Sequence, residues 1–66
     1  MQIILNGHPI EIPDGTSMSG LIEKLELTGH RLAVEVNEAL VPRSRFEEHC
    51  LAPGDKVEII HAVGGG

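Results

Sequence analysis

Apolar and polar residues follow two different periods along this chain, and the two periods predict strands and one helix. Residues 32–36 alternate with period two, so Leu32, Val34 and Val36 would share one face of a strand. The segment before them has apolar residues at the spacing i, i+3, i+4 and i+7, which is one face of an amphipathic helix. That helical face consists of Met18, Leu21, Ile22 and Leu25.

Turn residues predict that the chain begins with a β-hairpin. Asn6-Gly7 stands between apolar runs at residues 1–5 and 8–12. Asn-Gly is a strong signal for a two-residue hairpin loop, because both of its positions need positive φ. Pro9 has no N–H to donate to a neighbouring strand, so we expect the second strand to lie at an edge of the sheet.

Residues with known capping preferences predict the ends of the helix. Thr16 or Ser17 can cap its N-terminus, because a hydroxyl oxygen there accepts a bond from a free backbone N–H. Gly29 is the expected C-terminal stop, because glycine adopts the left-handed conformation that ends many helices.

The middle of the chain predicts a short strand followed by a polar connection. Asn37-Glu38 reads as a turn, and the apolar pair at residues 40–41 reads as a strand that Pro42 ends. Residues 43–50 are polar, and we expect Phe46 to plug the core beneath them.

This order of elements predicts an α+β domain of the β-grasp, or ubiquitin-like, class. One main helix would cross one face of a mixed sheet of four to five strands. The domain would occupy residues 1–63 and end in a flexible glycine tail, residues 64–66. A type II turn at Pro53-Gly54 leads to the last strand, residues 56–63. If that strand pairs with the first in the centre of the sheet, the tail leaves from the middle, and four extended residues reach about 13 Å.

Alternation in the two central strands predicts a partner-docking patch. If Ile3, Val57 and Ile59 point at the helix, then Ile4 and Ile60 point away from it. Exposed apolar residues on neighbouring strands often mark partner sites. The predicted patch consists of Ile4, Ala33, Ile60 and Ala62.

Length and charge narrow the class of function. The chain has 66 residues, with one Phe and no Trp or Tyr, so its core must be aliphatic and small. Such a core favours a binding or carrier module over a self-sufficient enzyme. The net charge of −5 disfavours binding to nucleic acid or to an anionic membrane. Met1 leads straight into a strand-like run, so we expect no secretory leader and a cytoplasmic location.

Side chains that carry catalytic or metal chemistry form no recognised motif in this sequence. The four histidines, His8, His30, His49 and His61, show no metal-ligand spacing, and we expect no metal site. No base or orienting acid is defined for Cys50, so we expect a buried, structural cysteine there. The pair Arg43 and Arg45 is either a solvated loop that offsets Glu47 and Glu48 or a docking contact.

The final glycines carry the most specific chemistry. Gly64-Gly65-Gly66 have no Cβ, so they can enter an active site too narrow for any other residue. The terminal carboxylate of Gly66 is therefore a candidate functional group. An ordinary chain end and a cloning remnant are the alternatives.

Taken in order, several short signatures along the whole chain resemble the ThiS family. They are MQIILNG at residues 1–7, Asn37 with Val41-Pro42-Arg43 and Phe46, Gly54-Asp55 with residues 57–60, and the closing Val63-Gly64-Gly65-Gly66. The resemblance implies a β-grasp sulfur carrier of thiamin biosynthesis, which is a carrier protein and not an enzyme. Cys50 lies outside these signatures and gains no role from them.

The resemblance also implies partners and a modified residue. An E1-like (ThiF-like) adenylating enzyme would use ATP and magnesium to activate the Gly66 carboxylate. A sulfur donor such as a cysteine desulfurase would convert it to a thiocarboxylate, and a ThiG-like thiazole synthase would take the sulfur. Gly64 and Gly65 would thread into the partner's active site.

Two other functions share the same activated tail. One is a sulfur carrier of another pathway, such as molybdopterin synthesis or tRNA thiolation. The other is a ubiquitin-like modifier that is joined to lysines. A plain interaction domain with an inert tail is a third alternative.

Overall fold

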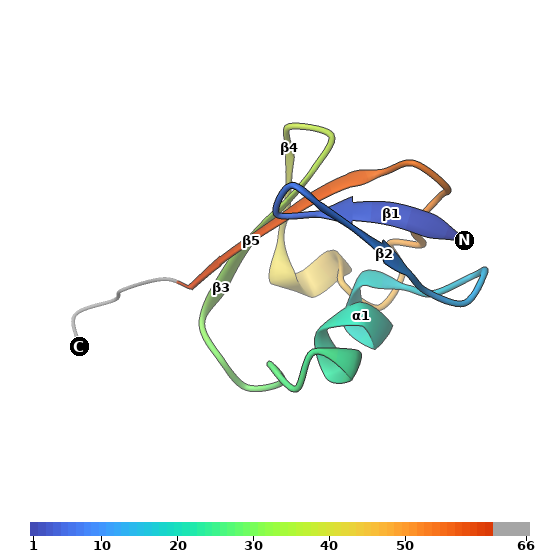
Figure 1. Cartoon of the computed structure of the whole chain (residues 1–66). Helices are drawn as coiled ribbons and strands as arrows, with labels where there is room; N and C mark the ends of the chain where they lie inside the picture. Colours follow the sequence, from blue (N-terminus) through green and yellow to red (C-terminus); the bar gives the residue numbers. More distant parts are fainter. Residues whose placement is uncertain (62–66) are drawn as a thin grey trace.

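The computed structural model describes residues 1–61 and shows a five-stranded mixed sheet with one α-helix against one face (Figure 1). The spatial order of the strands is β2-β1-β5-β3-β4. This confirms the predicted β-grasp arrangement. The elements in chain order are β1 (Gln2–Leu5), β2 (His8–Glu11), α1 (Met18–Lys24), β3 (Leu32–Val36), β4 (Ala39–Val41), the 3-10 helix η1 (Arg43–Arg45) and β5 (Lys56–His61).

The last strand lies in the centre of the sheet and pairs with the first, which is the arrangement that the sequence analysis took as a condition. β5 runs parallel to β1, where Ile4 is level with Lys56, and antiparallel to β3, where Val34 is level with Ile59. β2 is an edge strand, as predicted from Pro9, because a proline there has no N–H to donate to a further strand. The predicted end of this strand at residue 63 and the boundary with the glycine tail lie outside the described residues.

The core fills the space between the sheet and α1. The most deeply buried side chains are Ile3, Met18, Leu21, Val34 and Val57. The two predicted periods placed Met18, Leu21 and Val34 inward, and the inward side of Ile3 and Val57 is the one assumed for the docking patch. Leu25 and Leu32 pack at its margin and are half-buried. Phe46 is 9% exposed, so the predicted plug is confirmed. The polar connection that carries it contains η1, which the sequence analysis did not predict.

Two asparagines with positive φ fasten the ends of other strands to β5. Asn6 (φ 48°) follows β1, and its Oδ1 accepts a hydrogen bond from the Ile59 N–H at 2.9 Å, while its Nδ2 donates to the Ile59 carbonyl at 3.3 Å. Asn37 (φ 52°) follows β3, and its Oδ1 accepts from the Lys56 N–H at 3.0 Å. Each asparagine side chain bonds a backbone group of β5, so the pairing with β5 continues past the residue where the neighbouring strand ends. The second loop residues, Gly7 and Glu38, also have positive φ, as type I′ hairpin loops require.

The helix is capped as predicted at its start but ends earlier than predicted. The Ser17 hydroxyl accepts a hydrogen bond from the Gly20 N–H at 3.0 Å. At the other end, the Leu27 N–H donates to the Ile22 carbonyl and the Glu26 N–H to the Glu23 carbonyl. These bonds form a Schellman motif with Glu26 at the left-handed position, φ 60°. The prediction of Gly29 as the stop was wrong, because backbone bonds, and not a glycine, close this helix.

Cys50 is exposed, which corrects the prediction of a buried cysteine. The segment around it pairs with the chain just before α1, through Met18 N–H to the His49 carbonyl and Leu51 N–H to the Thr16 carbonyl. Side chains alternate along such an extended segment. Leu51 takes the inward position and is 5% exposed, so Cys50 points outward.

The amino group of Met1 is tied to the end of the first hairpin. It donates to the Ile12 carbonyl at 2.7 Å and lies 3.1 Å from a carboxylate oxygen of Asp14. The hydrogen bond to Asp14 is the main cause that raises the pKa of this amino group above its usual value. No helix in the described part of the chain has the length and apolar character needed to cross a membrane.

Replacing Glu26 with glycine is expected to stabilise the domain. A side chain costs roughly 1–2 kcal/mol in the left-handed conformation, and glycine costs roughly 0.5–1 kcal/mol in chain entropy. The free energy of unfolding should therefore rise by about 0.5–1 kcal/mol, measured by urea denaturation. Lys24→Gly, two residues earlier and still helical, is the control and should lose about 1 kcal/mol. A loss of stability in Glu26→Gly would contradict the strain argument.

Candidate partner-docking face

The sheet has one face packed against the helix and one face that points away from it. α1 and η1 both lie on the same side of the sheet (Figure 1). On the opposite side, β3, β4 and β5 present the side chains that alternate with the core residues. We define the docking face by five of them, Ala33, Glu35, Leu40, Glu58 and Ile60, and leave out Lys56 at the start of β5.

Exposed apolar side chains stand at two places on the docking face. Ile60 is 57% exposed and lies opposite Ala33, and Leu40 is 69% exposed and lies opposite Glu35. They are the two large apolar side chains that residues 1–61 leave exposed. Neither belongs to the hydrophobic core of its own domain, which makes both candidates for side chains that a partner covers.

A pair of like charges lies between the two apolar residues. Glu35 and Glu58 are directly opposite each other on β3 and β5. Like charges at directly opposite positions destabilise a sheet. In the described part of the chain, neither carboxylate forms an ion pair. The pair therefore costs stability in the free domain, and a basic side chain of a partner would relieve the repulsion.

The structure places Ile60 as the sequence predicted, but it separates Ile60 from Ile4. Ile4 is level with Lys56, four residues before Ile60, which is about 13 Å along a strand. It is also half-buried and lies opposite Pro9. The reason is that β1 ends at Leu5, well before β5 does. Ile4 and Ile60 do not form one patch, and Ala62 and residues 64–66 lie outside the described residues.

Sequence reasoning missed Leu40 and the two glutamates of the docking face. The period of residues 32–36 already put Glu35 on the same side as Ala33. The two-residue loop Asn37-Glu38 sets Glu35 opposite Leu40, so the position of Leu40 could have been found from the sequence. What opposes Glu35 on β5 depends on the register between β3 and β5, which lie far apart in the sequence, and no local pattern could have supplied that register.

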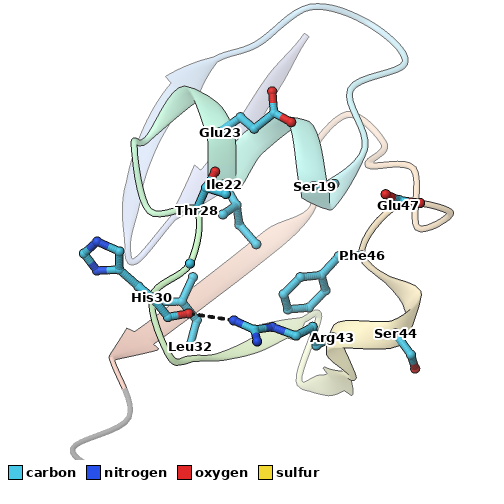
Figure 2. Close-up of a pocket in the computed structure, with 11 residues that line it drawn as sticks. Ser19, Ile22, Glu23, Thr28, His30, Leu32, Arg43, Ser44, Phe46 and Glu47 are labelled. Carbon is cyan, nitrogen blue, oxygen red and sulfur yellow. Dashed lines mark hydrogen bonds between the residues drawn. The ribbon is translucent and has the colours of Figure 1, made fainter.

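A cleft of about 500 Å³ lies on the helix side, between α1, η1 and the start of β3. Its floor is apolar and includes Ile22, Leu32 and Phe46 (Figure 2). Arg43 reaches along it and donates from Nη2 to the His30 carbonyl at 2.9 Å, so it ties η1 to the entry of β3. Arg45 lies 3.9 Å from Glu48, which fits the prediction of a loop charge offset by nearby acids.

Within residues 1–61, no group of three or more His, Cys, Asp or Glu side chains is arranged to hold a metal ion. The same residues show no buried side-chain donor or acceptor without a hydrogen-bond partner. The described residues do form the docking face, a candidate surface for protein contact that includes β5, the last strand before the C-terminal glycines in the sequence.

Comparisons with known proteins show the family and the fold of this chain. The model of the ThiS family matches residues 3–66. The sulfur carrier protein ThiS of Bacillus subtilis is 32% identical over 63 residues, which are 94% of this chain and 96% of that protein. A thiazole synthase of Magnetococcus marinus is 38% identical over all 66 residues, and this chain spans 20% of its length.

A solved structure shows the same fold. The crystal structure of the thiamine biosynthesis protein ThiS from Geobacter metallireducens superimposes with a TM-score of 0.87 and 26% identity, and the match covers the whole of both chains. The family model and the relatives cover nearly all of the sequence, and the strand order is that of a β-grasp domain. The chain belongs to the ThiS family of sulfur carrier proteins in thiamin biosynthesis.

Proposed function

We propose that this chain carries sulfur on its C-terminal residue for the formation of the thiazole ring of thiamin. In this proposal the Gly66 carboxylate is adenylated and then converted to a thiocarboxylate, which gives its sulfur to a thiazole synthase. The chain acts as a cytoplasmic co-substrate of two enzymes and catalyses neither reaction.

The observation that carries the proposal is that β5, the strand nearest the C-terminal glycines in the sequence, forms part of the docking face. Ile60, at the end of that face, is the last outward-pointing residue of β5, and six residues link it to Gly66. Six residues span at most about 20 Å when extended. A partner that covers Ile60 can therefore hold its own active site within reach of Gly66.

The chemistry needs an activated carboxylate. A carboxylate is a poor electrophile, because its negative charge resists attack and oxide is a poor leaving group. We propose that an E1-like (ThiF-like) enzyme with ATP and magnesium joins the Gly66 oxygen to AMP and releases pyrophosphate. The terminal sulfur of a persulfide on a cysteine desulfurase then displaces AMP from the acyl carbon to give an acyl disulfide. Thiols such as free cysteine reduce its S–S bond, which leaves the thiocarboxylate on Gly66 and releases the desulfurase thiol. Gly64 and Gly65 fit the narrow entrance because they have no side chains.

The relatives support thiazole synthase as the acceptor of the sulfur. Segments similar to this whole chain make up 20% of two proteins named thiazole synthase, from Magnetococcus marinus and Paramagnetospirillum magneticum. A carrier segment in the same polypeptide as a synthase is at a high effective concentration for it. We propose a ThiG-like partner for this chain on that ground.

The charges of the docking face suit a basic partner surface. Glu35 and Glu58 repel each other in the free domain, and the whole chain carries a net charge of −5. A basic residue of the activating enzyme would pair with both carboxylates and steer the approach of the carrier.

Removal of Gly66, or replacement of Gly65 by leucine, should abolish activation and leave the domain folded. The measurement is the intact mass after incubation with the activating enzyme, ATP, magnesium, cysteine and a desulfurase. Exchange of one oxygen for sulfur adds about 16 Da to the unmodified protein. The gain must map to Gly66, because oxidation of Met1, Met18 or Cys50 adds nearly the same mass.

Ala52→Leu, which adds bulk at an exposed position before the start of β5, is the control and should be modified normally. Continued adenylation of the truncated chain would contradict the tail mechanism. Accumulation of lysine-linked adducts in cells, without free thiocarboxylate, would indicate a protein modifier instead.

Ile60→Glu should weaken binding to the activating enzyme at least about tenfold, because it puts a charge where a partner buries an apolar side chain. The same change should alter the free energy of unfolding by less than about 1 kcal/mol, because Ile60 is already 57% exposed. Binding is measured by calorimetry and stability by thermal melting. Unchanged affinity would remove Ile60 from the interface.

Glu58→Gln should stabilise the free domain and weaken its activation. Loss of the repulsion from Glu35 should raise the free energy of unfolding by roughly 0.2–1 kcal/mol at low salt. The KM of the carrier in adenylation should rise, because the partner loses a charged contact. Glu23→Gln, an exposed acid on α1, is the control and should change neither quantity. Higher stability with an unchanged KM would show that the acidic pair has no part in docking.

A further inference from the structure

Two histidines that lie far apart in the sequence meet at the end of β5. His30 Nδ1 and His61 Nε2 are 3.2 Å apart, and the rings meet edge to face with their centroids 5.4 Å apart. The two residues are separated by 31 positions. His61 and Ile60 are consecutive on the strand, so the pair lies on the other side of the sheet from the docking face.

The backbone holds both histidines in place. The His30 N–H donates to the Leu27 carbonyl at 3.0 Å, and the His30 carbonyl accepts from Arg43 at 2.9 Å. His61 is the last residue of β5 that pairs with β3, where it lies opposite Leu32. In Figure 2 the His30 imidazole points away from Arg43 and out of the cleft, so the guanidinium faces the backbone and not the ring.

The side chains of the pair have no evident role in folding. Both histidines are exposed and neither belongs to the hydrophobic core. A hydrogen bond between two imidazoles on the surface is worth little, because water competes for the same nitrogen atoms. The two ring nitrogens are therefore available to bind a ligand.

The distance between His30 Nδ1 and His61 Nε2 is close to the distance between two imidazole nitrogens that bind the same zinc ion. A zinc ion binds imidazole nitrogen at about 2.0–2.1 Å, so two nitrogens on one tetrahedral zinc lie about 3.3 Å apart. The observed separation of 3.2 Å is close to this value, and a metal ion would take the place of the proton between the two nitrogens. Imidazole is a ligand for zinc, copper and nickel, whereas magnesium and calcium prefer oxygen.

We propose that His30 and His61 form a two-imidazole site for a divalent transition-metal ion, with Zn²⁺ as the probe. His30 supplies Nδ1, His61 supplies Nε2, and water completes the coordination. Because only two side chains of the described residues take part, the ion exchanges freely and is not a structural metal. The site rests on residues 30 and 61 alone, so it stands or falls independently of the sulfur-carrier proposal.

The test is a titration of the untagged, full-length chain with zinc chloride, followed by correlation spectra of the imidazole ¹⁵N nuclei. The background variant is Cys50→Ser, which removes the exposed thiol next to His49 as a competing ligand. The experiment is run at pH 7.5, because zinc binds neutral imidazole. We expect the ring signals of His30 and His61 to shift together, with one zinc per chain, and magnesium chloride to leave both in place.

Variants of each histidine separate this site from unspecific binding. His30→Gln and His61→Gln should each weaken zinc binding at least about tenfold, because each removes half of the protein ligands. His8→Gln and His49→Gln are the controls and should bind as before. Backbone spectra without zinc check that every variant is folded.

Three outcomes would overturn the proposal. They are shifts at His8 or His49 in place of the pair, one zinc per two chains, and equal affinity in the His30→Gln and control variants.

Discussion

The structure depends on the pairing of the last strand with the first in the centre of the sheet. β5 contacts β1 on one side and β3 on the other, so it joins two hairpin-like halves that are otherwise separate. Because β1 and β5 are parallel, all the chain between them acts as one long crossover. The helix is part of that crossover and covers the inner face. Without this pairing, neither half would have a second layer on which to close the core.

Asn6 and Asn37, which follow β1 and β3, add side-chain hydrogen bonds to the backbone of β5. The Asn6 amide bonds both backbone groups of Ile59, although β1 has already turned away at that point. The Asn37 Oδ1 accepts from the Lys56 N–H at 3.0 Å, its Nδ2 donates to the Asp55 carboxylate at 3.0 Å, and its backbone N–H donates to the Lys56 carbonyl at 2.8 Å. Asparagine suits these positions for two reasons. It tolerates positive φ, and its side chain carries one donor and one acceptor, as the backbone does.

The two faces of β5 serve different purposes. Val57 and Ile59 are 1% and 8% exposed and stabilise the domain. Glu58 and Ile60, on the other face, contribute little to folding, and Glu58 opposes it by facing Glu35. A strand that must hold the fold and also present a docking surface can divide the two tasks between alternate residues. This division explains how a chain of 66 residues keeps both a core and an exposed face that the proposed partners would contact.

The sequence by itself determined the strands and the helix α1, their order and their inward faces, because hydrophobic periodicity and turn residues act within a few positions. It also gave the family resemblance and the candidate role of Gly66. The tertiary structure alone decided the registers, which separate Ile4 from Ile60, oppose Glu35 to Glu58 and bring His30 to His61. It also decided that Cys50 faces outward and that Glu26 ends the helix, because neighbouring segments compete there for inward positions and backbone bonds. Contacts between residues 20 to 50 positions apart follow from how whole strands align, and no local pattern encodes that alignment.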